Sequence, residues 1–207
     1  MTVQLQANKA FDAQDIERLV QDHQVHRDVY TSQDVYALEM QHLFANVWVF
    51  VGHESQTPKH GDYFTTQIGS QPVIQVRHSD GGITVLHNRC PHKGTKIAID
   101  RHGNTGTFFR CPYHAWSFET DGRLKAVPLE SGYSDTSFET TENANGIKPV
   151  GAVHNHRGFV FARLADSGIS FNDFFGDSLS SIDNMVDRSP EGPVSYTHLT
   201  LPTSTHG

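Results

Sequence analysis

The stretch RCPYHAW, Arg110 to Trp116, contains one of only two cysteines in a chain of 207 residues. Cys111 is followed by a proline and, three positions later, by His114. The other cysteine, Cys90, lies in NRCPHKG, where a proline also follows it and His92 stands two positions later. Thiolates and neutral imidazoles both bind soft and borderline metals. The repeated Cys-Pro-His setting therefore predicts one metal centre held by two loops.

Composition narrows the class of protein. A net charge of -7 and 36% hydrophobic residues suit a domain of moderate size, or one domain and part of another. The negative balance disfavours a nucleic-acid partner, and two cysteines are too few for a disulfide framework. The N-terminus has no signal-peptide pattern, and no apolar run reaches membrane-spanning length. We expect a soluble cytoplasmic protein without a membrane partner.

Strand-like runs separated by turn signals extend from Gly61 to about Leu164. SDGG and Asp121-Gly122 predict hairpin turns. Many short strands at this spacing predict a mainly β fold, a small antiparallel sandwich or barrel-like domain. The runs are DYFTTQIG, QPVIQVRH, ITVLHN, GTFFRC, AWSFETDGRL and RGFVFARL.

Helical patterns flank these strands. Thr31 or Ser32 can cap a helix, with Asp34 in its first turn. After the strands, apolar residues recur at helical spacing between residues 171 and 186 and predict a single helix whose stripe packs into a core. The members of the stripe are Phe171, Phe174, Phe175, Leu179, Ile182, Met185 and Val186.

These patterns divide the chain into four parts. We expect an N-terminal arm and helix over residues 1–46, the β domain over 47–165, the start of a second domain over 166–193 and a tail over 194–207. The tail, VSYTHLTLPTSTHG, has no acidic or basic residue, and its first ten residues match the in-frame translation of a common transposase-type sequencing adapter. We therefore expect the native sequence to end near Pro193; the alternative is an ordinary C-terminal segment.

Three interpretations of the ligand pattern compete. A structural zinc finger pairs Cys with Cys at spacings of two to four residues, whereas both pairs here are mixed and are separated by one and two residues. Chance placement of two buried thiols leaves the repeated proline unexplained. A Rieske [2Fe–2S] cluster takes two cysteines on one iron and two histidines on the other. The pattern favours this cluster, and its ligands are then Cys90, His92, Cys111 and His114.

Longer stretches around both loops resemble the N-terminal part of the large (alpha) subunit of Rieske non-haem iron aromatic-ring-hydroxylating oxygenases. They are NVWVFVGHESQTPKHGDYFTTQIGSQPVIQV, LHNRCPHKG, FRCPYHAWSFETDGRL and RGFVFARL. The resemblance runs from about Thr31 to about Asp187 and is nearest to members that act on aromatic acids. It implies a Rieske-type domain followed by the beginning of an α+β catalytic domain. It also implies a reductase or ferredoxin as electron donor, a possible small beta subunit, and a homotrimer or α3β3 hexamer.

The resemblance implies an electron relay in aromatic compound catabolism. In this family a mononuclear iron held by two histidines and a carboxylate activates O2, and the sequence stops before such a motif. We therefore assign no catalytic residue, and expect this chain alone to be inactive in hydroxylation as a dioxygenase or monooxygenase. His154 and His156 are interpreted as loop or strand-edge residues. The alternative is a stand-alone Rieske ferredoxin, although such carriers lack the flanking helices.

Side chains around the ligands predict the reduction potential. Neutral imidazole ligands place Rieske clusters at about −150 to +300 mV. Respiratory Rieske proteins resemble CTHLGC…CPCHGS, with disulfide cysteines where this chain has Thr95 and Tyr113, and a serine donor where it has Trp116. Fewer hydrogen bonds to the cluster stabilise the reduced state less. We therefore expect a potential at the low end of this range.

Other positions of the two loops have conformational roles. Pro91 and Pro112 are expected to stiffen them, and Gly94 supplies a flexible backbone. Lys93 stands where the family often has arginine, and loses the bidentate geometry of a guanidinium. Ala115 stands where glycine is commoner and tolerates a positive φ poorly. The second loop therefore either avoids that conformation or carries strain.

Overall fold

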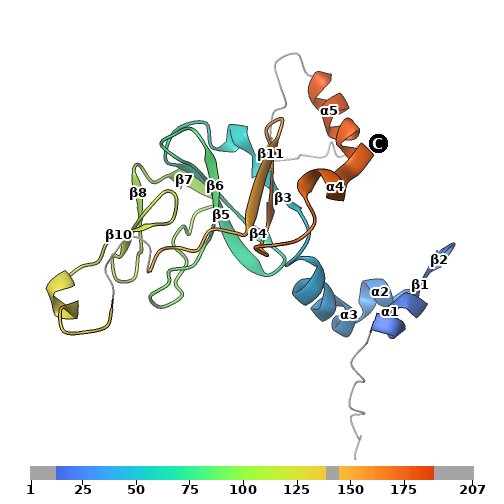
Figure 1. Cartoon of the computed structure of the whole chain (residues 1–207), viewed down its shortest axis with the longest axis horizontal. Helices are drawn as coiled ribbons and strands as arrows, with labels where there is room; N and C mark the ends of the chain where they lie inside the picture. Colours follow the sequence, from blue (N-terminus) through green and yellow to red (C-terminus); the bar gives the residue numbers. More distant parts are fainter. Residues whose placement is uncertain (1–12, 139–144, 189–207) are drawn as a thin grey trace, which may run out of the picture.

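The computed structural model describes residues 13–138 and 145–188, in which all strand pairs are antiparallel (Figure 1). The prediction of a mainly β, antiparallel domain with a helical arm is therefore confirmed. The strands form a four-stranded sheet, two three-stranded sheets and a two-stranded ribbon. The tail over residues 194–207, including His198 and His206, lies outside the described residues.

The four-stranded sheet has the order β6-β5-β4-β7. Its central strand β5 buries four consecutive side chains, Val73 to Val76, because both of its faces are covered. The SDGG turn joins β5 to β6, and the Asp80 carboxylate accepts a hydrogen bond of 2.7 Å from the Gly82 N–H, as expected for a hairpin turn. The strands are β4 (Asp62–Ile68), β5 (Gln71–Arg77), β6 (Ile83–His87) and β7 (His102–Asn104).

The sheet β10-β9-β8 carries the RCPYHAW stretch between two of its strands. In its register Phe109 pairs with Phe118 across β8 and β9. Phe118, Leu124 and Ile147 are completely or almost completely buried beneath it. Burying each such side chain contributes about 1.5–3 kcal/mol, so this loop rises from a well-packed base. The strands are β8 (Phe108–Arg110), β9 (Ser117–Glu119) and β10 (Leu124–Ala126).

The third sheet, β11-β12-β3, joins the beginning of the β domain to its end. Strand β3 (Val49–His53) pairs with β12 (Phe159–Arg163), and His53 lies opposite Phe159. Strand β11 (Ala152–His156) forms one edge of this sheet and contains both His154 and His156. Of the two interpretations of these histidines, as loop or as strand-edge residues, the structure shows the second.

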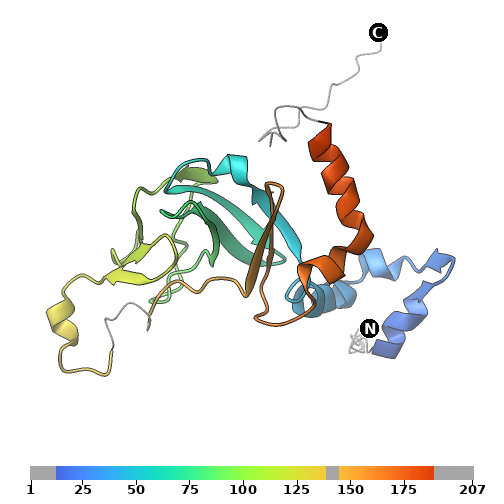
Figure 2. The same cartoon turned by 45° about the horizontal axis from the view of Figure 1, so that its top comes forward.

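The helix expected over residues 171–187 is interrupted. Helix α4 (Phe171–Phe175) is followed by a 3-10 turn (Gly176–Ser178) and then by α5 (Leu179–Asp187). Gly176 has a φ of +48°, which ends the first helix. Both helices lie beside the sheet that contains β11 (Figure 2).

The predicted core stripe of this segment is only partly correct. Phe171 is buried against Trp48 and Phe161, and Phe175, Leu179 and Ile182 pack around them. Phe174 and Met185 are instead 37% and 54% exposed. The packed residues come from both sides of the interruption at Gly176, and so do the two exposed ones.

Short elements make up the N-terminal arm, and α1, β1 and β2 lie away from the larger sheets (Figure 2). Ser32 caps α3, where its Oγ accepts a hydrogen bond from the Val35 N–H. None of the helices in the described part of the chain combines the length and the apolar character of a membrane span. The elements are α1 (Ala13–Leu19), β1 (Val20–Gln21), β2 (Gln24–Val25), α2 (Asp28–Thr31), α3 (Gln33–Leu38) and a π-helix (Glu39–Leu43).

Candidate metal centre

The first ligand loop, Cys90 to Thr95, follows strand β6. The Cys90 N–H donates to the Thr95 carbonyl at 2.8 Å, and the Gly94 N–H donates to the Cys90 carbonyl at 2.9 Å. Gly94 has a φ of +76°, a conformation that glycine adopts without steric cost. Two backbone hydrogen bonds and one glycine thus close the loop into a compact turn.

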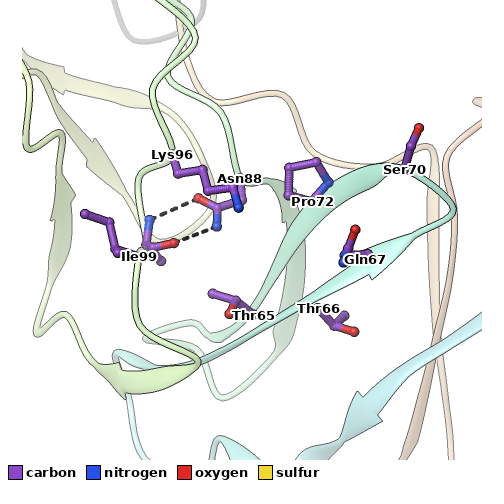
Figure 3. A pocket seen from close by; sticks show the side chains of 9 residues that line it. Thr65, Thr66, Gln67, Ser70, Pro72, Asn88, Lys96 and Ile99 are labelled. Carbon is purple, nitrogen blue, oxygen red and sulfur yellow. Dashed lines mark hydrogen bonds between the residues drawn. The ribbon is translucent and has the colours of Figure 1, made fainter.

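Buried Asn88 fixes the chain on both sides of the first loop. Its side-chain amide donates to the Ala98 carbonyl at 2.7 Å, and its oxygen accepts from the Ile97 and Ala98 N–H groups at 2.8 and 3.0 Å. Figure 3 shows the two bonds to Ala98 beside a polar pocket that Thr65 and Lys96 also line. The side chain satisfies backbone groups that the irregular segment after the loop would otherwise leave unpaired.

The second ligand loop, Cys111 to Trp116, repeats the same hydrogen bonds. The Cys111 N–H donates to the Trp116 carbonyl at 2.7 Å, and the Ala115 N–H donates to the Cys111 carbonyl at 3.0 Å. Ala115 occupies the position of Gly94 and has a φ of +59°. Of the two conformations considered for Ala115, the loop adopts the strained one, which costs an alanine about 1–2 kcal/mol.

The four candidate ligands are arranged as two pairs. Cys90 and Cys111 are free thiols, 2% and 3% exposed, within the same core cluster. Burial, with a smaller contribution from the neighbouring Cys111 thiol, raises the pKa of the Cys90 thiol to about 11. The rings of His92 and His114 lie outside this core, with centroids 4.7 Å apart.

The two pairs consist of the residue types that a Rieske cluster requires. Within residues 13–138 and 145–188, no group of three or more His, Cys, Asp or Glu side chains is placed to hold a single ion. A [2Fe–2S] cluster of the Rieske type requires two thiolates at one iron and two imidazoles at the other. Two adjoining thiols and two facing imidazoles on separate loops fit that requirement.

Aromatic side chains hold the histidines in place. The indole of buried Trp116 stacks on the His92 ring with a centroid distance of 4.7 Å and an interplanar angle of 2°. Tyr113 is 63% exposed, and the centroid of its ring lies 3.7 Å from the centroid of the His114 ring. Loss of contact with solvent is the main cause that lowers the pKa of His92, and the charges of the nearby His114 and Lys93 also lower it. The flanking prolines, Pro91 and Pro112, are exposed at the surface of the two turns.

Two further aromatic residues extend this stack and were not expected from the sequence. Phe138 contacts Trp116 with a centroid distance of 5.3 Å, and Tyr133 lies 4.7 Å from Phe138. Both belong to the segment after β10, which contains a 3-10 turn (Glu130–Tyr133). Figure 1 shows this segment projecting from the end of the molecule opposite α5. Its residues are distant from the loops in the chain, and no local pattern links them.

An open groove of about 660 Å³ runs along the first loop. Cys90 and His92 line one part of it, and Arg89, Lys93 and Lys148 supply cationic side chains. His114 and the rest of the second loop do not line this groove. Lys148 was not expected here, because it follows the first loop by more than fifty residues.

Comparison with known proteins identifies this arrangement. Residues 47–140 match the model of the Rieske [2Fe–2S] domain. Toluate 1,2-dioxygenase subunit alpha from Pseudomonas putida is 38% identical over 80% of this chain and 36% of its own length. The chain contains a Rieske [2Fe–2S] domain and is similar to the large subunits of Rieske oxygenases. The segment matched by the domain model contains both ligand loops and all four candidate ligands.

Relatives within the Rieske oxygenase family differ in what their names say they oxidise. The oxygenase subunit of glycine betaine monooxygenase from Chromohalobacter salexigens is 39% identical over 74% of this chain and 33% of its own length. The structure of naphthalene 1,2-dioxygenase from Rhodococcus sp. superimposes with a TM-score of 0.76 and 29% identity, covering 86% of this chain and 39% of that one. The chain thus spans somewhat over a third of the length of the relatives it matches.

Proposed function

We propose that Cys90 and Cys111 hold one iron of a Rieske [2Fe–2S] cluster and that His92 and His114 hold the other. The observation that carries this proposal is the pairing of two buried free thiols beneath two facing imidazoles. The cluster supplies one-electron oxidation and reduction when it is bound. The domain division at residues 47–165 and 166–193 also stays a proposal.

The residues of this chain would prepare the site for that electron exchange. Core packing around Cys90 and Cys111 keeps water away from the sulfurs. The parallel indole of Trp116 restricts rotation of the His92 ring. His114 remains exposed, so one of its ring nitrogens can face a neighbouring group. These contacts limit structural change when the charge of the site changes.

The whole protein is proposed to oxidise an aromatic compound with O2 and NADH-derived electrons. A reductase or ferredoxin would deliver the electrons, and a mononuclear iron in a C-terminal catalytic domain would receive them from the cluster. The similarity to the toluate enzyme subunit supports an aromatic acid as the substrate class. A cytoplasmic homotrimer, or an α3β3 hexamer with a small beta subunit, completes this proposal.

Reconstitution tests the cluster assignment. We expect the chain, refolded anaerobically with iron and sulfide, to bind two irons and two sulfides and to give a Rieske-type EPR spectrum after reduction. His92→Ala should lose this spectrum, whereas His60→Ala, at an exposed histidine away from the loops, should keep it. A colourless protein that binds one zinc ion would contradict the proposal.

The reduction potential provides a second test. We expect it at the low end of the range of about −150 to +300 mV. Thr95 and Tyr113 cannot form the disulfide of high-potential clusters, and Trp116 offers no hydroxyl donor. The nearby hydroxyl of Ser117 donates to the Ala115 carbonyl at 3.3 Å. A measured potential well above about +100 mV, in the upper part of that range, would contradict this expectation.

A further inference from the structure

The groove along the first loop is a concentration of positive charge on a negatively charged chain. Residues 81–99 contain Arg89, Lys93 and Lys96 and no carboxylate, although the whole chain has a net charge of -7. Lys148 approaches the same groove from the segment before β11. The second loop, in contrast, has no charged side chain between Cys111 and Phe118.

These cations are available to a partner. Within the described ranges, Arg89, Lys93 and Lys96 are exposed and none of them forms an ion pair. Lys148 approaches Asp166 at 3.9 Å, but both side chains are largely exposed, so solvent screens their interaction. Among the ion pairs of the described residues, this contact with Asp166 is the one that involves a cation of the groove.

Arg89 is placed across the first loop. A Cβ atom at Gly94 would lie 3.2 Å from its Nε and 3.3 Å from an Nη atom. The guanidinium therefore lies against the glycine backbone, beside the turn that contains Cys90 and His92. In this structure the positive charge of Arg89 therefore lies beside the first loop.

We propose that this basic groove is the docking surface for the electron donor, a protein with an acidic face around its own redox centre. The proposal rests on the proposed function, because it assumes a cluster at Cys90 and His92. A partner seated in the groove would approach two candidate ligands directly. Complementary charge raises association rates by about 10–1,000-fold and orients the encounter. One electron would pass from the reduced donor to the oxidised cluster, with no atom transferred.

The test measures cluster reduction by two reductants in a stopped-flow instrument. The first is a reduced, acidic plant-type [2Fe–2S] ferredoxin, and the second is the uncharged radical of photoreduced 5-deazariboflavin. We expect Lys148→Glu to lower the second-order rate constant with ferredoxin about tenfold at low salt. The difference should disappear near 1 M salt, where the Debye length is about 3 Å. The rate constant for reduction by deazariboflavin should be the same in Lys148→Glu as in the natural sequence.

Lys59→Glu is the matched control, because Lys59 is exposed and does not line the groove. An equal effect of Lys59→Glu and Lys148→Glu, or no effect of Lys148→Glu, would overturn the docking proposal. So would an equal loss with deazariboflavin, since it would indicate damage to the cluster site. A chain that binds no cluster would instead refute the proposed function, so the two failures are distinguishable.

Discussion

The two ligand loops have the same backbone and different side chains. In each, the cysteine N–H donates to the carbonyl five residues later, and the residue at the fifth position has a positive φ. The first loop carries basic side chains and lines an open groove, whereas the second carries Tyr113 and Trp116 and no charge. The shared hydrogen bonds fix the ligands, which leaves the remaining side chains free to serve different purposes.

The largest expected difference concerns the last residue of each loop. Trp116→Ala should destabilise the protein by about 3–5 kcal/mol, because it removes a buried aromatic side chain. Thr95→Ala, at the equivalent position, should cost about 1 kcal/mol or less. Urea unfolding measures both free energies. Equal losses would show that the aromatic packing of the second loop has no special role.

The variant Phe138→Ala tests whether Phe138 only stabilises the fold or also positions Trp116 and the stacked His92. It leaves Trp116 in place but removes the ring that contacts it at 5.3 Å. We expect the reduced cluster to show a broader EPR spectrum, because the indole and the stacked His92 gain freedom to move. Phe138→Leu should restore most of the stability but not the sharp spectrum. Identical spectra for all three proteins would contradict this role.

A smaller effect should follow from exchanging the residues with positive φ. Gly94→Ala introduces strain of about 1–2 kcal/mol and presses a methyl group against Arg89. Ala115→Gly relieves strain of that size, but the more flexible unfolded glycine offsets about 0.5–1 kcal/mol of it. The two substitutions should therefore change the free energy of unfolding in opposite directions. Thermal or urea unfolding of the apoprotein measures this without involving the cluster.

The smallest expected effect is a dependence of the free energy of unfolding on pH, through His87 beside the first loop. Burial, followed by the charge of Lys148, lowers the pKa of His87, and Asp166 opposes this weakly. Below about pH 6.5, the ordinary pKa of histidine, His87 binds a proton more readily in the unfolded chain than in the folded protein. The stability present above that pH is therefore lost as pH falls through the folded value.

Urea unfolding at pH 7.5 and 5.5 tests this dependence. His87→Gln should lose less stability on acidification than the natural sequence, whereas His60→Gln, at an exposed position, should behave like it. Buried His53 and partly buried His154, whose pKa values are also lowered by loss of solvent contact, should leave some pH dependence in every variant. If the free energy of unfolding of His87→Gln changed with pH as much as that of the natural sequence, His87 would not contribute to the pH dependence.

The sequence was most informative where chemistry and local turns determine structure. Two cysteines with fixed neighbours predicted the candidate ligands, and the Asp-Gly turns predicted the hairpins. It was less informative about conformations imposed by the fold. For Ala115, at a position where glycine is commoner, two conformations were considered, and only the structure showed that its φ is positive.

Long-range contacts were the main features beyond the reach of sequence patterns. Phe138 reaches Trp116, and Lys148 reaches the groove of the first loop, through the arrangement of three sheets. Strand β11 was not among the strands predicted from the sequence, although its two histidines were interpreted as loop or strand-edge residues. The periodic apolar residues after Phe171 suggested one helix because periodicity alone does not reveal the interruption at Gly176.

The pairing of β3 with β12 has a consequence for the modularity of the molecule. His53 lies opposite Phe159, and the Glu54 N–H donates to the Gly158 carbonyl at 2.8 Å, so the chain leaves the ligand-bearing region beside the point where it enters. A unit whose two ends are neighbours can be transplanted into another host protein, or circularly permuted, without stretching its connections. We therefore expect that a host protein could accept the segment with the ligand loops at a single surface position.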